Sequence, residues 1–448
     1  MRIRLNGRTA DVAASASVVA IAVIAQLSPW IAAASILIVV CFVLAAFSDS
    51  KATIWLLICI LSLPAALFPS IGGLESDATY KGVLTVALLL IAFREGLHRS
   101  APINALFALY IAALVVSLLG FSAGGLDFSF VAKASLGFTY YWLGALIAWK
   151  VTSPAVVLQA IRTAPLICVG ASLIFGPLLH KAIFQKEYSG AVRLAAMLIP
   201  AHLAMLALAA VAASLFIMFM GFNTRASAIW LVVNFVILLM TLTRGAALAA
   251  VILLMFGGMA VGQTNAGRSA RNGVRAAILI AGFSALALIP SFLSRNQGNS
   301  YEGSFNTSGR SNSWDFYLGV AEKSPWFGYG PGYSSVAVSE LAPTGVQSVF
   351  AAPHNEFIHF YVDYGLPIAA GIFATIGILW ISTAKRLPGP VSTLWVGFGI
   401  AFAVYAFVDN PLSTPQFGVP LALIISVLYS WQNVRKRDLS ASLDAGVQ

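Results

Sequence analysis

The chain has 448 residues, of which 59% are hydrophobic and only 9% are charged, and its mean hydropathy is +0.88. Soluble globular domains carry about 25% charged residues, so this composition excludes a soluble domain and indicates an integral membrane protein. The net charge of +10 is then interpreted as a signal of membrane topology, and it gives no reason to expect a nucleic-acid partner.

Apolar runs of about 17 to 25 residues, long enough to cross a bilayer as helices, recur along the chain. They predict an all-α, polytopic transmembrane helix bundle with about 12 to 14 spans and one large external loop. The predicted spans are 11–28, 31–47, 53–69, 80–93, 103–121, 130–149, 158–179, 195–220, 226–243, 244–262, 275–294, 364–383, 391–408 and 414–431. A re-entrant or broken helix is the alternative for the first pair and for the short fourth run.

The spans divide the chain into consecutive parts. Residues 1–294 are predicted to form an N-terminal bundle of about eleven spans. Residues 295–363 form a large loop with an interfacial helix, 364–434 form the C-terminal spans, and 435–448 form a tail. All three cysteines lie inside apolar runs, so neither a disulfide framework nor a zinc site is expected.

The basic residues set the predicted orientation. A cytoplasmic N-terminus places most of the 26 basic residues on the cytoplasmic side and most acidic residues on the other side. The basic residues left outside are Lys81, Lys133, Lys181, Lys186, Arg193, Arg244, Arg295, Arg310 and Lys323. We therefore expect both termini in the cytoplasm and the polar segment 295–352 on the periplasmic face of a bacterial inner membrane.

Two of these outside residues lie beside apolar runs. Arg244 stands between two such runs with no room for a real loop, and Arg193 stands just before the run 195–220. A guanidinium in such a place is costly unless it is paired or faces water. Because arginine binds phosphate with two parallel hydrogen bonds, the pair predicts an anion clamp at the outer surface. The alternative is that each arginine only anchors the topology at the interface.

A second candidate element begins at Pro353, since proline suits the first turn of a helix. His354, Asn355 and Glu356 stand at this predicted helix start, and Gly365 breaks the helix before the next apolar span. A histidine exposed there can accept or orient a proton near neutral pH. A capping or interfacial histidine without chemistry is the alternative.

The external loop carries Arg310 and combines glycines with aromatic residues over 323–333. Glycine permits tight turns, and Trp and Tyr side chains stack on sugar rings. A Walker phosphate loop is excluded because no Gly-Lys-Ser/Thr ending is present. Contact between these aromatic residues and the membrane interface is the simpler interpretation.

Three stretches together resemble the O-antigen ligase and O-antigen polymerase superfamily, the WaaL and Wzy type. They are Thr-Arg-Gly-Ala at 243–246, the loop glycines at 309 and 328–332, and Pro-His-Asn-Glu-Phe at 353–357 followed by Gly365. The resemblance is firmest over 190–410 and implies a GT-C-like glycosyltransferase that needs no metal and no cofactor. It implies an undecaprenyl-pyrophosphate-linked glycan as donor, lipid A-core or another glycan as acceptor, and surrounding membrane lipids.

The resemblance also implies roles for particular residues. The residues expected to bind the donor pyrophosphate are Arg193, Arg244 and, more loosely, Arg310. His354 matches the histidine beside the attacking acceptor hydroxyl, and with Arg244 it is expected to be catalytic. Asn355 and Glu356 are predicted to support substrate binding next to it. His202 resembles part of a His-Pro-Asn pattern, but its neighbours differ and no catalytic role is assigned to it.

The motifs do not separate a ligase from a polymerase of O-antigen or exopolysaccharide, although a ligase is slightly favoured. A transporter of polysaccharide or lipid-linked sugar is the alternative from another class, since many helices with intramembrane proline and glycine are ordinary there. A transporter would favour charges near the bilayer midplane and an internal repeat. Most charges lie instead at span ends, and one large loop makes the two halves of the chain unlike.

Overall fold

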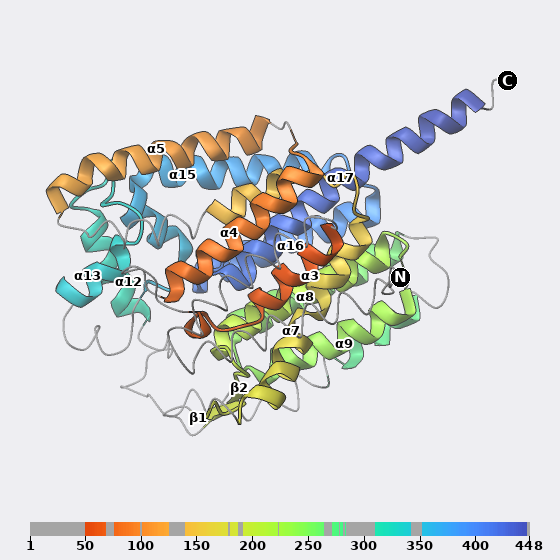
Figure 1. The fold of residues 1–448 in the computed structure, drawn as a ribbon, viewed down its shortest axis with the longest axis horizontal. Helices are drawn as coiled ribbons and strands as arrows, with labels where there is room; N and C mark the ends of the chain where they lie inside the picture. The colour runs from red at the N-terminus through yellow and green to blue at the C-terminus, as the bar shows by residue number, and fades with distance from the viewer. Residues whose placement is uncertain are drawn as a thin grey trace, which may run out of the picture.

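The structure is a computed structural model, and the part of the chain that it describes is a bundle of long helices (Figure 1). The described residues are 50–68, 76–98, 101–124, 139–177, 180–186, 191–222, 224–263, 271–276, 278–280, 283, 310–341 and 352–445. The predicted spans 11–28 and 31–47 lie outside the described residues, as do most of 275–294 and the beginning of 130–149.

Six of the described helices are long and apolar enough to cross a membrane. They are α4 (Ser76–Glu95), α7 (Pro154–Phe175), α8 (Pro200–Phe219), α10 (Arg244–Gly262), α15 (Glu356–Ala384) and α16 (Gly389–Val408). Shorter apolar stretches lie in α3 (Ser50–Leu61), α5 (Ala101–Gly124), α9 (Thr224–Met240) and α17 (Pro415–Ala445). The predicted helical membrane bundle is confirmed in this coarse form, and the total of about 12 to 14 spans stays a prediction.

Helix α8 lies at the centre of the bundle and contacts α7, α9, α10, α16 and α17. Its side chains are buried almost without interruption from Leu203 to Met218. Many of them are alanines, and small side chains let helix backbones approach closely where lipid provides no hydrophobic drive for association. The position of α8 therefore fixes where the ends of its neighbours lie.

Helices α15 and α16 are joined by a pair of tryptophans. The rings of Trp380 and Trp395 stack with centroids 4.0 Å apart. Each indole nitrogen donates to the other residue's carbonyl oxygen, at 2.8 and 3.0 Å. Both polar N–H groups are therefore satisfied inside the bundle, where water cannot replace the lost hydrogen bonds.

The predicted span 195–220 begins too early. Helix α8 starts at Pro200, and the residues before it form a hairpin of β1 (Phe184–Lys186) and β2 (Val192–Leu194), with Gln185 opposite Arg193. Ala196 follows with a φ of 53°, outside the right-handed helical region. The apolar character of 195–199 suggested a membrane helix, but the β1–β2 hairpin just before these residues and the proline at 200 decide the local backbone.

Other boundaries also differ from the prediction. The short fourth run is a continuous helix, α4, so it is neither re-entrant nor broken within its described length. The run 53–69 ends as an α-helix at Leu61 and continues as the 3-10 turn η2 (Ala65–Leu67) after Pro64. Helix α17 extends beyond the predicted tail boundary at 435, to Ala445.

The described part of 295–352, the segment predicted to be external, contains two short helices, α12 (Arg310–Ala321) and α13 (Tyr333–Leu341), at one end of the bundle (Figure 1). The chain between them crosses α15 at Gly365, where α15 is kinked with φ 73° and ψ 164°. Tyr329 and Gly330 donate to the carbonyls of residues 362 and 363, at 3.0 and 2.8 Å. The kink predicted at Gly365 is confirmed, and it is the place where the external segment is fastened to the bundle.

Replacing Gly365 with alanine is expected to loosen this crossing. An added Cβ would lie 2.5 Å from the carbonyl carbon of Trp326 and 2.6 Å from the nitrogen of Phe327, and the positive φ already disfavours a side chain. We expect a loss of about 2–3 kcal/mol of stability, measured by thermal unfolding together with proteolysis of 310–341. Gly319→Ala is the matched control, since no heavy atom lies within 4 Å of its added Cβ. Equal behaviour of the two variants would contradict the prediction.

Candidate functional site

Arg193 reaches from strand β2 to the turn that precedes α10. Its Nε donates to the carbonyl of Thr241 at 2.7 Å, and its Nη2 donates to the hydroxyl of Thr243 at 3.0 Å. The residue is buried, with 8% of its surface exposed. The first residue of α10 is Arg244, so two guanidinium groups belong to this helix start, where backbone N–H groups also lack helical partners. Such a helix start attracts anions.

The start of α10 packs closely on the end of α16. Gly245 is required there, because an added Cβ would lie 2.6 Å from Cγ2 of Val408 and 3.2 Å from the ring of Tyr405. A larger residue would push the two helices apart. The residue that follows α16 is Asp409, so this contact places a carboxylate beside the arginine-bearing helix start.

His354 pairs with Asp409. The Nδ1 of His354 lies 3.2 Å from Oδ1 of Asp409, while the hydroxyl of Tyr405 and the backbone N–H of Asn410 donate to the same carboxylate at 3.2 and 3.0 Å. Asp409 is 7% exposed, whereas the His354 side chain is 36% exposed. With an ionised carboxylate at Nδ1, this nitrogen donates, and Nε2 of the neutral ring remains to accept a proton.

The environment keeps Asp409 ionised. Burial raises its pKa, but the hydrogen bond and charge of His354, the charge of Arg310 and the Asn410 N–H outweigh burial and lower the pKa below its ordinary value. Since the folded-state pKa is below the unfolded one, ionised Asp409 contributes stability above the ordinary carboxyl range. That contribution is lost as the pH falls through the folded-state pKa.

Arg310 joins this group from the external segment. It is the first residue of α12 and acts electrostatically on Asp409, and both Arg193 and Arg310 act on the Tyr405 hydroxyl. Helix α12 is held in place by Trp314, whose indole nitrogen donates to the carbonyl of residue 353 at 2.9 Å. The structure thus brings the predicted site residues His354 and Arg310 to the carboxylate after α16. Arg193 acts on Tyr405 beside it, and Arg244 lies at the adjoining helix start.

The helix predicted to begin at Pro353 begins three residues later, at Glu356. His354 has a φ of 48°, which a right-handed helix does not allow, and Asn355 is the N-cap, accepting from the N–H groups of Phe357 and Ile358 at 3.0 and 3.2 Å. The proline therefore occupies no first helical turn. The cap leaves His354 outside the helix, turned toward Asp409.

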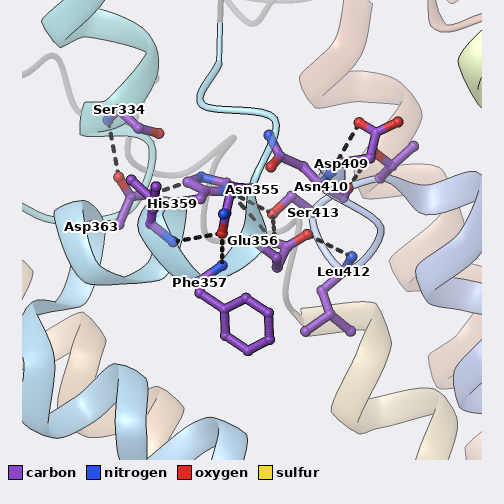
Figure 2. A network of polar contacts seen from close by, with 12 residues as sticks. Ser334, Asn355, Glu356, Phe357, His359, Asp363, Asp409, Asn410, Leu412 and Ser413 are labelled. Carbon is purple, nitrogen blue, oxygen red and sulfur yellow. Dashed lines mark hydrogen bonds and ion pairs between the residues drawn. The ribbon is translucent and has the colours of Figure 1, made fainter. Parts of the chain in front are cut away.

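Asn355 and Glu356 make contacts within the protein. Glu356 is fully buried and accepts from the backbone N–H of Leu412 at 3.0 Å and from the hydroxyl of Ser413 at 2.5 Å. His359 lies 3.5 Å from Glu356 and 3.1 Å from Asp363, so the network in Figure 2 ties the start of α15 to the turn before α17. These contacts hold the start of α15, and so the residues beside it, in place. Substrate binding by Asn355 and Glu356 stays a prediction.

Residues 229–374 match the family model described as O-antigen ligase. The matched segment contains α10, α12 and the first part of α15, and with them Arg244, Arg310 and His354. This match supports the O-antigen ligase and polymerase superfamily. The match implies a ligase-like or polymerase-like membrane function. No curated protein matches the chain.

Two residues that contact the predicted site were missed by sequence reasoning, and both lie outside the matched segment. Asp409 and Tyr405 follow it by more than thirty positions. The sequence did show an acidic residue directly after an apolar span, but Asp-Asn-Pro is also typical of an ordinary turn after a helix. It could not show that the partner of Asp409 is His354, which lies 55 positions away.

His202 lies near the same group of residues. It stands in the first turn of α8 and interacts electrostatically with Asp409, Asp77 and Lys81. Asp77 and Lys81 themselves form an ion pair of 2.9 Å on α4. Among the residues that the structure describes, no group of three or more His, Cys, Asp or Glu side chains is arranged to hold a metal ion.

Proposed function

We propose that the protein is a GT-C-like inner-membrane glycosyltransferase that transfers a glycan from undecaprenyl pyrophosphate to an acceptor hydroxyl at the periplasmic face. The proposal includes the predicted 12 to 14 spans and a ligase-like choice of acceptor, lipid A-core. Support comes from the superfamily match and from one geometric observation. The His354–Asp409 pair lies beside a helix start that carries Arg244 and is contacted by Arg193.

The arginine-bearing start of α10 is suited to binding the leaving group, and the His354–Asp409 pair is suited to removing the acceptor proton. A pyrophosphate is a compact anion, and a helix N-terminus with convergent guanidinium groups is suited to binding it. The acceptor hydroxyl carries a proton that must leave during attack. Nε2 of His354 is suited to accept it, because Asp409 holds the ring through Nδ1 and stabilises the imidazolium that results.

In the proposed reaction the acceptor oxygen attacks the anomeric carbon and forms a new glycosidic bond. The bond between that carbon and the pyrophosphate oxygen breaks, and undecaprenyl pyrophosphate leaves with the bonding electrons. The acceptor proton passes to His354. Negative charge grows on the leaving oxygen, and the prepositioned Arg193, Arg244 and Arg310 stabilise it in the transition state. With the arginines stabilising the leaving group and His354 accepting the proton, the proposed reaction requires no metal.

Asp409→Asn tests whether the carboxylate positions His354. The amide keeps the shape of the side chain but presents no full negative charge to Nδ1, so we expect kcat to fall about 10²-fold or more. The KM for the donor should change little, since Asp409 faces His354 and not the pyrophosphate. A purely structural role would instead lower protein yield and leave kcat of the folded fraction near that of the wild type.

The proposed function is tested directly with purified protein in liposomes. The protein receives an undecaprenyl-pyrophosphate oligosaccharide, with and without lipid A-core, and products are separated by size. One discrete shift of lipid A-core supports a ligase, and a ladder made from the donor alone supports a polymerase. Movement of intact donor across the bilayer without any new glycosidic bond would contradict the enzyme assignment and favour a transporter.

A further inference from the structure

Arg162 is a buried cation far from the site described above. It lies in α7 with 7% of its surface exposed. Its Nη1 donates to the hydroxyl of Ser227 at 2.9 Å, and its guanidinium carbon lies 5.6 Å from the ring centre of Trp230. Its Nε is enclosed and has no hydrogen-bond partner among the described residues. No acidic side chain of the described residues forms an ion pair with it.

A hydroxyl and an aromatic face do not neutralise a guanidinium in this position. Burying a charge without an opposite charge is expensive, and charged residues within membrane helices are normally paired or exposed to water. Arg386 provides an internal comparison. It makes the same two kinds of contact, with the hydroxyl of Tyr429 at 3.1 Å and with its ring at 5.6 Å, but it is exposed. Binding of an anion would therefore offset a desolvation cost at Arg162 that the exposed Arg386 does not have.

The guanidinium of Arg162 is close to the start of a helix. Ser227 lies three residues after Thr224, where α9 begins, or about 4.5 Å along the helix axis at 1.5 Å per residue. The first N–H groups of a helix lack helical acceptors and give this end partial positive charge. Arg162 thus reaches from the interior of α7 toward the start of α9.

The surroundings of this helix start are also basic. The helical segment 271–276 packs against α9, since an added Cβ at Gly273 would lie 3.0 Å from Cβ of Ala228. Its residues Arg271 and Arg275 are exposed. Glu95, an acidic side chain at this same end of the bundle, is already bonded to Thr152 and to backbone N–H groups of 150–152. The local charge therefore favours an anionic partner.

We propose that Arg162, Ser227 and the first turn of α9 bind the phosphate of an acidic phospholipid headgroup, with Trp230 beside it and Arg271 and Arg275 nearby. Nη2 of Arg162 is the nitrogen directed to this ligand, because Nη1 is bonded to Ser227 and Nε is enclosed. The ligand class is a phosphodiester anion. This end of the bundle is opposite the His354 site, so under the proposed orientation the lipid belongs to the cytoplasmic leaflet.

The test measures headgroup selectivity in the full-length protein. Purified protein in a neutral detergent is titrated with phosphatidylglycerol, with phosphatidylcholine of the same acyl chains, or with inorganic phosphate. Thermal unfolding gives the stabilisation, and native mass spectrometry gives the number of lipids retained. The variants are Arg162→Gln and Arg162→Lys, and Arg386→Gln is the matched control with the same hydroxyl and aromatic contacts.

We expect phosphatidylglycerol to raise the Tm of the wild type more than phosphatidylcholine does, and Arg162→Gln to weaken this preference about tenfold in apparent affinity. Arg162→Lys should retain part of the preference, and Arg386→Gln should retain all of it. Because the readout is the difference between two lipids in one variant, a general loss of stability does not imitate the result.

Stabilisation by inorganic phosphate alone, equal to that by phosphatidylglycerol, would assign the site to a free anion and overturn the lipid source. An identical response of the wild type to both lipids would overturn the site itself. The measurement contains no glycan transfer, so its outcome is independent of the proposed enzymatic function.

Discussion

His354→Ala is expected to reduce glycan transfer by about 10² to 10⁴-fold, because the variant has no group that can take the proton from the acceptor hydroxyl. Protein level and membrane insertion should be unchanged, since the His354 side chain is 36% exposed and lies before the start of α15. The measurement is the initial rate in the liposome transfer assay, normalised to folded protein. A rate near that of the wild type would exclude His354 from the reaction.

The backbone at His354 requires its own control, because its φ of 48° is unfavourable for alanine. His354→Asn is a second variant, since asparagine tolerates this conformation but is not a base. His180 is a matched position, an exposed histidine with a φ of 52°. His180→Ala should transfer glycan at the wild-type rate, which would separate loss of the imidazole from any effect of the local backbone.

Arg244→Ala is expected to give the second large loss, about 10² to 10³-fold in kcat. The guanidinium at the start of α10 is proposed to stabilise charge that develops on the leaving pyrophosphate, so the loss should fall on kcat more than on donor binding. Arg244→Lys should recover only part of the rate, because an ammonium does not form the paired hydrogen bonds of a guanidinium. Steady-state kinetics with varied donor concentration separate the two parameters.

Arg386→Ala is the control for Arg244, since it removes an exposed arginine from the opposite end of the bundle. Transfer by this variant should be unchanged. If Arg244→Ala raised only the donor KM, Arg244 would be a binding residue without a part in the transition state. If it changed neither parameter, the anion clamp would be wrong.

The sequence was sufficient to predict most of the helical framework. Backbone polar groups inside a bilayer must be satisfied within the segment, so a long apolar run predicts a helix with few alternatives. The predicted run 244–262 coincides with α10. The prediction of a helix over 195–220 was wrong for its first five residues. The backbone of Arg193, just before them, pairs with a strand that has no distinctive apolar pattern of its own.

For the candidate site, the sequence indicated which residues to examine but not how they meet. Arg244 and His354 were singled out because each interrupts an apolar context or begins a helix. The pairing of His354 with Asp409 depends on Gly245, which lets α10 approach α16, and such helix contacts between distant segments follow no local code. The geometry of His354 depends on Asn355, which is the N-cap of α15 and leaves His354 outside the helix. The predicted helix start at Pro353 placed both residues inside the helix and was therefore wrong at this point.

The residues around His354 are synthesised at different times, because they lie far apart along the chain. Arg193 and Arg244 are synthesised long before Asp409, which follows α16 and is separated from Arg193 by seven of the described helices. During insertion into the membrane, the growing chain therefore holds its two cations before their carboxylate neighbour exists. Assembly of the site must await synthesis of α16 and Asp409, so a chain released by the ribosome before Asp409 would lack the partner of His354. In this arrangement the site becomes complete only after its carboxylate has been synthesised.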